Sequence, residues 1–554
     1  MPARPKHMRK PGEAPSRQVG THSRATSSKR TEAQVGRSAA MMGVLVIISR
    51  ITGFLRTWGQ AYALGVTALA SAYTVANNMP NQLYELVAGG MIMTAFLPVY
   101  LSTKKRLGRE GSTRYASNLL SIVTLLMGIV TVVSFVLATP IIWTQSFSAH
   151  ADFDSGLSIY LFRFFVIEVV LYALSSIISG ILNAERDYLW SNAAPIFNNI
   201  VCTSSFFLYV AFAKSNPTLA ILSLALGNPL GVLVQLLVQL PSLRRHGIFL
   251  TPFIDWHDPA LRETLSIGIP TLMVTIASFP TVAVQTSSAL QVTVAGASVA
   301  YYARLWYMLP YSVFAIPTTV AMFTELSDYA ASGDMGSFKR GVRFGTERIV
   351  FMLVPFTMYL IFFAPCLITI LAAGKFDASG LADTTLYLQW LSVALPFYGI
   401  STYLQKVCSS LRHMSFFAVA TVIAAVVQVA FCMLFTNVFG LAGVAFSSAL
   451  FFGAVDMVTF LHVRRQIGAL GLKSMAVSFV RSLLLGMAGV AVAALVFAGL
   501  QRFLGPWGTS IAKSVLYCVC GGVPALLATY GLAVVLSVPE AGAVRALVGR
   551  LMRR

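Results

Sequence analysis

Long apolar stretches separated by short polar loops fill the chain from Ala39 to Ser537. A helix that crosses the hydrocarbon core of a bilayer needs about 20 predominantly apolar residues, and these stretches have that length or more. The pattern therefore predicts about fourteen transmembrane helices, as a series of six, a second series of six and a final pair. The predicted helices cover residues 39–64, 69–101, 115–140, 157–183, 190–213, 217–242, 264–290, 297–326, 349–373, 383–406, 414–437, 440–463, 477–501 and 511–537.

These helices predict an all-α polytopic membrane protein with two six-helix lobes and two C-terminal helices. A longer polar joint separates the two series of six. The expected organisation is a disordered basic cytoplasmic tail at 1–38, an N-terminal lobe at 39–242, a cytoplasmic linker at 243–263, a C-terminal lobe at 264–466, two additional transmembrane helices at 467–537 and a basic cytoplasmic tail at 538–554.

The composition supports this class and excludes others. Of the 554 residues, 56% are hydrophobic and only 11% are charged, far more apolar surface than a soluble core of this length can bury. A cytosolic enzyme, a secreted disulfide scaffold and a disordered protein are therefore excluded. The chain also lacks the long alternating polar strands typical of an outer-membrane barrel.

The positive charge, formally +20, is distributed along the chain in a way that predicts orientation. Loops after the even-numbered helices carry 19 Lys and Arg residues, whereas loops after the odd-numbered helices carry 4. Because cytoplasmic loops are enriched in these residues, both termini are expected in the cytoplasm. Anionic lipid headgroups account for the nine basic residues of the N-terminal tail, so we expect membrane lipids and no nucleic acid as partners.

Four arginines lie inside predicted membrane helices: Arg50, Arg56, Arg163 and Arg304. An arginine at this depth is costly and normally faces a polar cavity or a charged partner. A guanidinium group binds phosphate oxygens bidentately and keeps its charge, which suits an anionic headgroup in a cavity. Arg50, near the middle of its helix, is the strongest candidate.

Structural alternatives stay open for these arginines. Arg50 or Arg56 can instead form an ion pair with an intramembrane acid, of which the clearest are Glu85, Glu168 and Asp456. Arg163 is placed to reach the external surface along the membrane rather than to bind a ligand. Arg304 lies among aromatic residues that can line a wet cavity.

Polar and helix-breaking residues interrupt the second helix of each series. The first series has Pro80, Asn81, Gly89 and Gly90, and the second has Pro310. We expect a kink or an unwound turn at these positions. In transporters such interruptions tend to mark a gate or a binding site.

No catalytic constellation is present, so the sequence predicts neither an enzyme nor a cofactor or metal requirement. No phosphate-cradling glycine loop and no pair of acids with glycosidase spacing occurs. The six cysteines lie within or at the ends of apolar segments without metal-ligand spacing, and we interpret them as small buried hydrophobic residues.

Residues 49–56, Ser-Arg-Ile-Thr-Gly-Phe-Leu-Arg, resemble the first-helix signature of the MurJ (MviN) lipid II flippases, Ser-Arg-x-x-Gly-Phe-x-Arg. Further similar motifs follow in the family's order over about residues 40 to 540. They are Met79–Leu83, Ala95–Pro98, Gly180–Asn183, Ala194–Asn199, Gln239–Arg245, Tyr301–Ala303 and Gly374–Phe376.

The resemblance implies a fold of the MOP exporter superfamily, with two lobes around a cavity, and transport of undecaprenyl-pyrophosphate-linked peptidoglycan precursor by alternating access. It implies that Arg50, Arg56 and Arg304 contact the pyrophosphate or nearby sugars, and that the two additional helices accommodate the polyprenyl tail. Gly53, within the first motif, joins the positions expected to act in gating or helix breaking. Proteins of cell-wall synthesis or division are further candidate partners.

The chain departs from the family pattern at four positions. An acid near the start of the second helix is Ser71 here, an arginine after the Pro-Asn turn is Tyr84, and a later acid is Gly89. Leu305 occupies the family's arginine position in the eighth helix, so that Arg304 is displaced by one residue. These departures leave open export of another polyprenyl-linked glycan, or a transport-inactive homologue that acts as a cell-wall scaffold.

Overall fold

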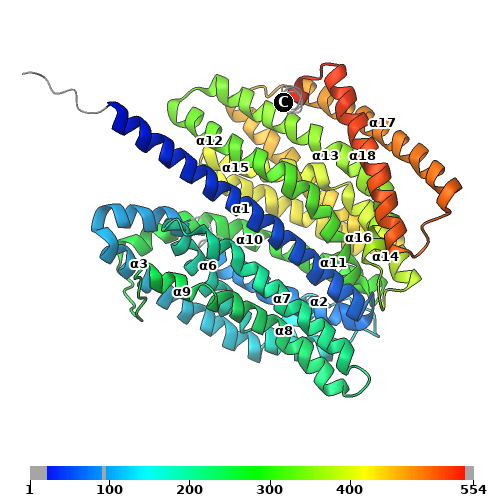
Figure 1. Cartoon of the computed structure of the whole chain (residues 1–554), viewed down its shortest axis with the longest axis horizontal. Helices are drawn as coiled ribbons and strands as arrows, with labels where there is room; N and C mark the ends of the chain where they lie inside the picture. Colours follow the sequence, from blue (N-terminus) through cyan, green and yellow to red (C-terminus); the bar gives the residue numbers. More distant parts are fainter. Residues whose placement is uncertain (1–20, 90–94, 543–554) are drawn as a thin grey trace, which may run out of the picture.

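The computed structural model describes residues 21–89 and 95–542, and every regular element in these ranges is a helix (Figure 1). Ten of the described helices are long and apolar enough to cross a membrane. Large apolar side chains such as Leu495 and Val535 are 74% and 78% exposed, which suits contact with lipid rather than water. The chain is therefore an all-α polytopic membrane protein.

The N-lobe, our name for the helical part of residues 39–242 with the start of its first helix, surrounds a single buried apolar cluster. Its elements are α1 (Thr21–Leu64), α2 (Ala68–Tyr84), the π-helix η1 (Glu85–Gly89), α3 (Leu97–Val136), α4 (Ala138–Thr144), α5 (Ser155–Phe165), α6 (Glu168–Ala184), α7 (Tyr188–Phe212), α8 (Pro217–Leu237) and α9 (Leu240–Arg245).

The C-lobe, our name for the helices of residues 259–467, surrounds a second apolar cluster. Its elements are α10 (Pro259–Val292), α11 (Gly296–Pro310), the π-helix η3 (Tyr311–Ala315), α12 (Ile316–Ser332), α13 (Met335–Leu371), α14 (Ala378–Ser392), α15 (Leu395–Ser410) and α16 (Met414–Ile467). The remaining elements are α17 (Leu472–Leu504), α18 (Ile511–Val535) and the short 3₁₀ helix η4 (Pro539–Ala541).

The arrangement in space follows this division. In Figure 1, α1 runs between the two groups of helices, while α17 and α18 lie at the outer edge of the C-lobe. Tyr359 of α13 and Thr529 of α18 hydrogen-bond through their hydroxyl groups, and the Tyr359 hydroxyl also lies 3.2 Å from the Ala525 carbonyl oxygen. The final pair therefore packs against α13 of the C-lobe.

The predicted helices coincide with described helical residues apart from short turns, although several boundaries differ, and α13 begins at Met335 rather than at residue 349. α1 begins at Thr21 rather than at residue 39. α3 spans the predicted polar loop before residue 115, interrupted only by the non-helical backbone of Gly108. α16 spans two predicted helices, with non-helical backbone at Gly440, where the second of them was expected to begin.

The interrupted helices contain π-helical turns. η1 follows α2, which continues past Pro80 and Asn81 to Tyr84, and η3 begins directly after Pro310. π-helical turns inside helices occur frequently at functional sites. The helix changes to π-helical geometry at Gly89 as expected, but it is not broken at Pro80 or Asn81, and Gly90 lies outside the described residues.

α1 is continuous at Gly53, so this residue does not break the helix, and its expected part in gating stays a prediction. A single glycine costs a helix only about 1 kcal/mol, which the packing of α1 against α7 can outweigh. A Cβ atom at Gly53 would lie 3.6 Å from the Asn199 amide nitrogen of α7, an ordinary contact.

Candidate functional site

The two lobes make direct backbone contacts at the end where α1 terminates. The Lys375 amide donates to the Tyr62 carbonyl oxygen at 3.2 Å. Gly65 and Gly374 have φ angles of +65° and +66°, and a Cβ at either would lie within 2.3 Å of a backbone oxygen of the opposite lobe. Only glycine combines this backbone conformation with so close an approach.

Side chains extend this closure. The Tyr302 hydroxyl donates to the Gly65 carbonyl oxygen at 3.0 Å, and Ser71 accepts a hydrogen bond from the Ser298 amide at 3.2 Å. The Ser71 and Ser298 hydroxyl oxygens are 3.5 Å apart, and both residues are fully buried. The seam between the lobes is closed at this end.

A cavity of about 530 Å³ lies in the seam farther along α1, walled by α1, α7, α11 and η3. Arg50 and Gly53 of α1 and Arg304 of α11 line it, together with polar residues of α7. The polar lining residues of α7 are Ser191, Asn192 and Asn199. The structure therefore brings together three of the predicted site residues at one cavity.

Both cavity arginines are exposed. Neither Arg50 nor Arg304 forms a hydrogen bond or an ion pair with another described residue. A cation without a protein partner inside a membrane segment is costly unless the site is wet or binds an anion. The alternative that Arg50 pairs with an intramembrane acid is therefore not realised in this conformation.

A second cavity of about 310 Å³ adjoins the first, because Tyr301 and Arg304 line both. Its wall includes Asn81 of α2, Glu85 of η1 and Gln285 of α10. Arg304 and Glu85 thus face one cavity with opposite charges without forming an ion pair. The π-helical turn η1 contributes Glu85, which links the helix interruption to the cavity wall.

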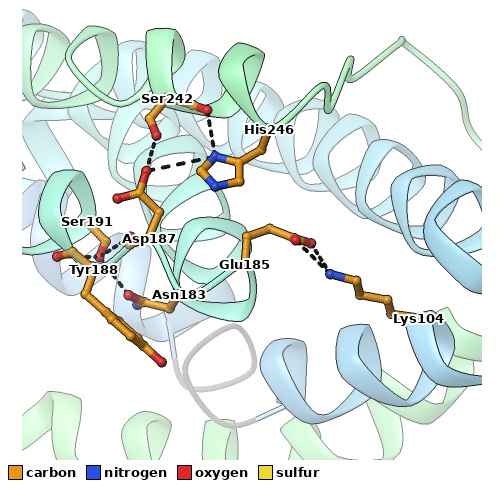
Figure 2. A network of polar contacts seen from close by, with 8 residues as sticks. All are labelled: Lys104, Asn183, Glu185, Asp187, Tyr188, Ser191, Ser242 and His246. Carbon is orange, nitrogen blue, oxygen red and sulfur yellow. Dashed lines mark hydrogen bonds and ion pairs between the residues drawn. The ribbon is translucent and has the colours of Figure 1, made fainter. Parts of the chain in front are cut away.

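A polar network outside the cavity holds the start of α7, which carries the cavity residue Ser191 (Figure 2). Ser242 of α9 hydrogen-bonds to Asp187, and the His246 ring nitrogen lies 3.9 Å from the same carboxylate. Ser191 in turn donates to the Asn183 side-chain oxygen at 2.6 Å.

Nearby, Lys104 of α3 pairs with Glu185 at 2.6 Å, also drawn in Figure 2. These contacts tie the turn between α6 and α7 to α3 and α9. Contacts from α3, α6 and α9 therefore hold the start of α7, which forms one wall of the cavity.

Arg56 does not line the cavity with Arg50. Its guanidinium donates to the Asn228 side-chain oxygen of α8 at 2.9 Å, and Asn228 donates to Asn77 of α2. Six residues along a helix correspond to about 9 Å of rise and about 120° of rotation, which turns Arg56 into the N-lobe. The structure thus separates Arg56 from Arg50 and Arg304.

Three further predicted positions do not line the two cavities. Arg163 of α5 is exposed over the Phe135 ring at 5.7 Å, away from the cavities, as expected for a side chain that runs along the membrane. Pro310 is buried at the end of α11, beside the cavity residue Leu309. Tyr84 donates a hydrogen bond to Ser176 within the N-lobe rather than facing the cavity.

Several cavity residues escaped prediction from the sequence. Asn192 of α7 and Gln285 of α10 were not singled out, and Asn199 was identified only as part of the motif Ala194–Asn199, although each is a polar residue inside an apolar stretch. That signal was available and is the same one that identified the arginines.

Comparison with known families is consistent with the motif analysis. A family model described as lipid II flippase MurJ matches residues 60–517. The probable lipid II flippase MurJ of Borreliella burgdorferi is 20% identical over 430 residues, which cover 77% of this chain and 83% of that protein. The lipid II flippase MurJ of Burkholderia cenocepacia is 24% identical over 349 residues, covering 62% and 67%.

Solved structures show the same fold. A lipid II flippase MurJ in an inward closed conformation superposes with a TM-score of 0.70 at 19% identity and covers 90% of this chain and 99% of that one. An inward-facing multidrug resistance MATE transporter of the MOP superfamily gives a TM-score of 0.63 at 15% identity, covering 77% and 98%. The family model matches well over half of the chain, so this multi-pass protein of the bacterial inner membrane belongs to the lipid II flippase MurJ family.

Proposed function

We propose that this chain moves lipid II, the undecaprenyl-pyrophosphate-linked peptidoglycan precursor, from the inner to the outer leaflet of the cytoplasmic membrane by alternating access. The observation that carries the proposal is the cavity between the lobes, where Arg50 and Arg304 lie without a protein partner in a chain of the MurJ family.

The chemistry of the cavity suits a pyrophosphate group. Guanidinium groups bind phosphate oxygens through paired, charge-assisted hydrogen bonds. Ser191, Asn192 and Asn199 add neutral hydrogen-bonding groups for sugar hydroxyls on the facing wall. The polyprenyl tail stays in lipid, and in this proposal α17 and α18 accommodate it.

Orientation follows from the basic loops. With both termini in the cytoplasm, α1 ends at the external face, so the contacts of Gly65, Ser71 and Tyr302 close the seam toward the outside. The larger cavity then serves the cytoplasmic side, where lipid II is loaded. Outward release requires that these contacts separate.

The test uses a bacterium depleted of its own flippase and made to express this chain, with lipid II measured at the outer face of the inner membrane. The wild-type protein is expected to restore exposure. Arg50→Ala removes charge-assisted hydrogen bonds worth about 1.5–3 kcal/mol, so we expect exposure to fall by about 10-fold to 100-fold.

Arg163→Ala is the matched control, since it makes the same change at an intramembrane arginine outside the cavity. It is expected to retain wild-type exposure. If inserted wild-type protein exposes no lipid II, the proposal is wrong, and export of another polyprenyl-linked glycan or a scaffold role among cell-wall proteins becomes the better account.

A further inference from the structure

A carboxyl group lies in the interior of the N-lobe without any hydrogen bond. Glu168, the first residue of α6, is 0% exposed, and neither of its carboxyl oxygens has a hydrogen-bond partner. It takes no part in the cavities described above. A fully buried, unpartnered acid in a membrane segment calls for an explanation.

One neighbouring cation, Arg56, already donates a hydrogen bond to another residue. Arg56 of α1 interacts electrostatically with Glu168 but donates its hydrogen bond to Asn228, and its Nε atom is buried and unpartnered. Two groups of opposite charge therefore share one interior without a direct ion pair.

The other helices around α6 supply weaker groups. α2 brings the buried, unpartnered Tyr73 hydroxyl, α7 brings Cys202, and α6 itself brings Tyr172. α8 carries no charged residue. On α3, Lys104 pairs with Glu185, which lies at the end of α6 opposite to Glu168. The charged residues of α9, Arg244 and Arg245, are exposed at its end.

This arrangement favours the neutral acid. An ionised carboxylate that is removed from water and accepts no hydrogen bond is strongly destabilised, whereas a carboxylic acid is far easier to bury. An ionised Glu168 would instead be stabilised by a direct, hydrogen-bonded pair with Arg56. Only one Arg56 nitrogen donates to Asn228, so the unpartnered Nε can supply that pair while the Asn228 bond is kept.

A polar route connects Glu168 with the second cavity. Tyr172 lies one helical turn after Glu168 on the same face of α6 and interacts electrostatically with it. Tyr172 packs against Tyr84 with ring centroids 6.2 Å apart, and Asn81 lines the cavity. Tyr172 therefore lies beside α2, the helix that carries Asn81, and in the proposal below it relays the proton between Glu168 and the cavity.

We propose that Glu168 is a proton-binding site of the N-lobe, protonated in this closed-seam conformation, and that release of its proton to cavity water draws the unpartnered Nε of Arg56 onto the carboxylate. Formation of this pair shifts α1 against α6. Since α1 also carries Arg50 and Gly53 into the larger cavity, proton binding is coupled to the substrate site. The proton site stands by itself, while the coupling rests on the proposed function.

The proton site is tested by infrared spectroscopy of the purified full-length protein in lipid nanodiscs, comparing acidic with alkaline buffer. Wild-type protein is expected to show the C=O absorption of a protonated carboxyl that disappears in alkaline buffer. Glu168→Gln, which keeps the size and polarity of the side chain, is expected to lose that change.

Asp456→Asn is the matched control, because Asp456 is a buried acid of the C-lobe, where one carboxyl oxygen accepts from Ser401 at 2.6 Å. It should retain the Glu168 signal. A pH-dependent carboxyl signal that is the same in Glu168→Gln as in wild type overturns the proton site.

The coupling is tested by the pH dependence of lipid II exposure in the depleted bacterium. Glu168→Gln is expected to abolish that dependence, whereas Asp456→Asn preserves it. If Glu168→Gln removes the infrared signal but leaves the pH dependence of exposure unchanged, the coupling is overturned. A wild-type chain that exposes no lipid II contradicts the proposed function, and the infrared comparison still decides the proton site.

Discussion

Arg50 and Arg56 lie six residues apart on one helix, yet they occupy two different kinds of site. Arg50 faces the cavity between the lobes and has no partner among the described residues, whereas Arg56 enters the N-lobe and bonds to Asn228. The same side chain has no protein partner in the seam and donates one hydrogen bond in the interior. The face of α1 on which an arginine lies therefore decides its role.

The two regions also differ in which charged groups lack a hydrogen-bond or ion-pair partner. The seam combines two unpaired cations with neutral hydrogen-bonding groups and tight backbone contacts at one end. The N-lobe interior instead places Arg56 among asparagines and beside the unpartnered acid Glu168. Arginines in the seam can bind water or substrate. In the interior, Arg56 can bind only neighbouring protein groups.

The largest effect is expected from locking the seam. Ser71→Cys combined with Ser298→Cys places two thiols where hydroxyl oxygens now lie 3.5 Å apart, a spacing that permits a disulfide after a small adjustment. Oxidation should abolish lipid II exposure and reduction should restore it.

Each single cysteine variant serves as the control, with the native cysteines unchanged, and should respond to neither treatment. Full exposure of lipid II by the cross-linked protein would mean that transport does not require this end of the seam to open.

An intermediate effect is expected from the interior. Asn228→Ala leaves the buried Arg56 guanidinium without its acceptor, and hydrogen bonds to charged groups are worth about 1.5–3 kcal/mol. The free energy of unfolding, measured by denaturant titration in detergent micelles, should fall by that amount.

Asn192→Ala makes the same change at the cavity wall, where the Asn192 amide bonds only within its own helix. A change within about 0.5 kcal/mol is expected there. Equal losses in the two variants would show that the interior arginine is no more dependent on its partner than the cavity wall is.

The membrane helices and the cavity arginines could be predicted from the sequence, whereas the environment of Arg56 could not. Hydropathy located the membrane helices and even the division of α16 near Gly440, because length and apolarity decide membrane insertion. It identified Arg50 and Arg304 because charge at bilayer depth is rare. It did not predict that Arg56 turns inward, since its acceptor Asn228 is 172 residues away in the chain.

The seam was equally beyond prediction from periodicity. In a membrane protein both lipid-facing and buried helix faces are apolar, so the pattern does not tell which face meets the other lobe. Ser71 illustrates this point, because it differs from the family's acid and yet forms a buried hydrogen bond to Ser298 across the seam. Such a contact depends on the conformation that the lobes adopt.

The smallest effect is expected at the loop that closes the seam. Asp377 follows the Gly374–Phe376 contact and caps α14, accepting hydrogen bonds from the Ser379 hydroxyl at 2.6 Å and the Gly380 amide at 2.8 Å. These bonds hold the pKa of its carboxyl below the ordinary value. The stabilisation is therefore present at neutral pH and is lost as the pH falls through the lowered pKa.

Asp377→Ala should reduce the free energy of unfolding by about 1 kcal/mol at neutral pH, and the difference from wild type should shrink in acid. Asp334→Ala is the matched control, since Asp334 caps α13 through the Ser337 amide and also has a lowered pKa. Both variants should lose similar stability, but only Asp377→Ala should slow disulfide formation between cysteines at positions 71 and 298. Equal cross-linking rates in the two variants would show that the cap stabilises its helix without holding the seam closed.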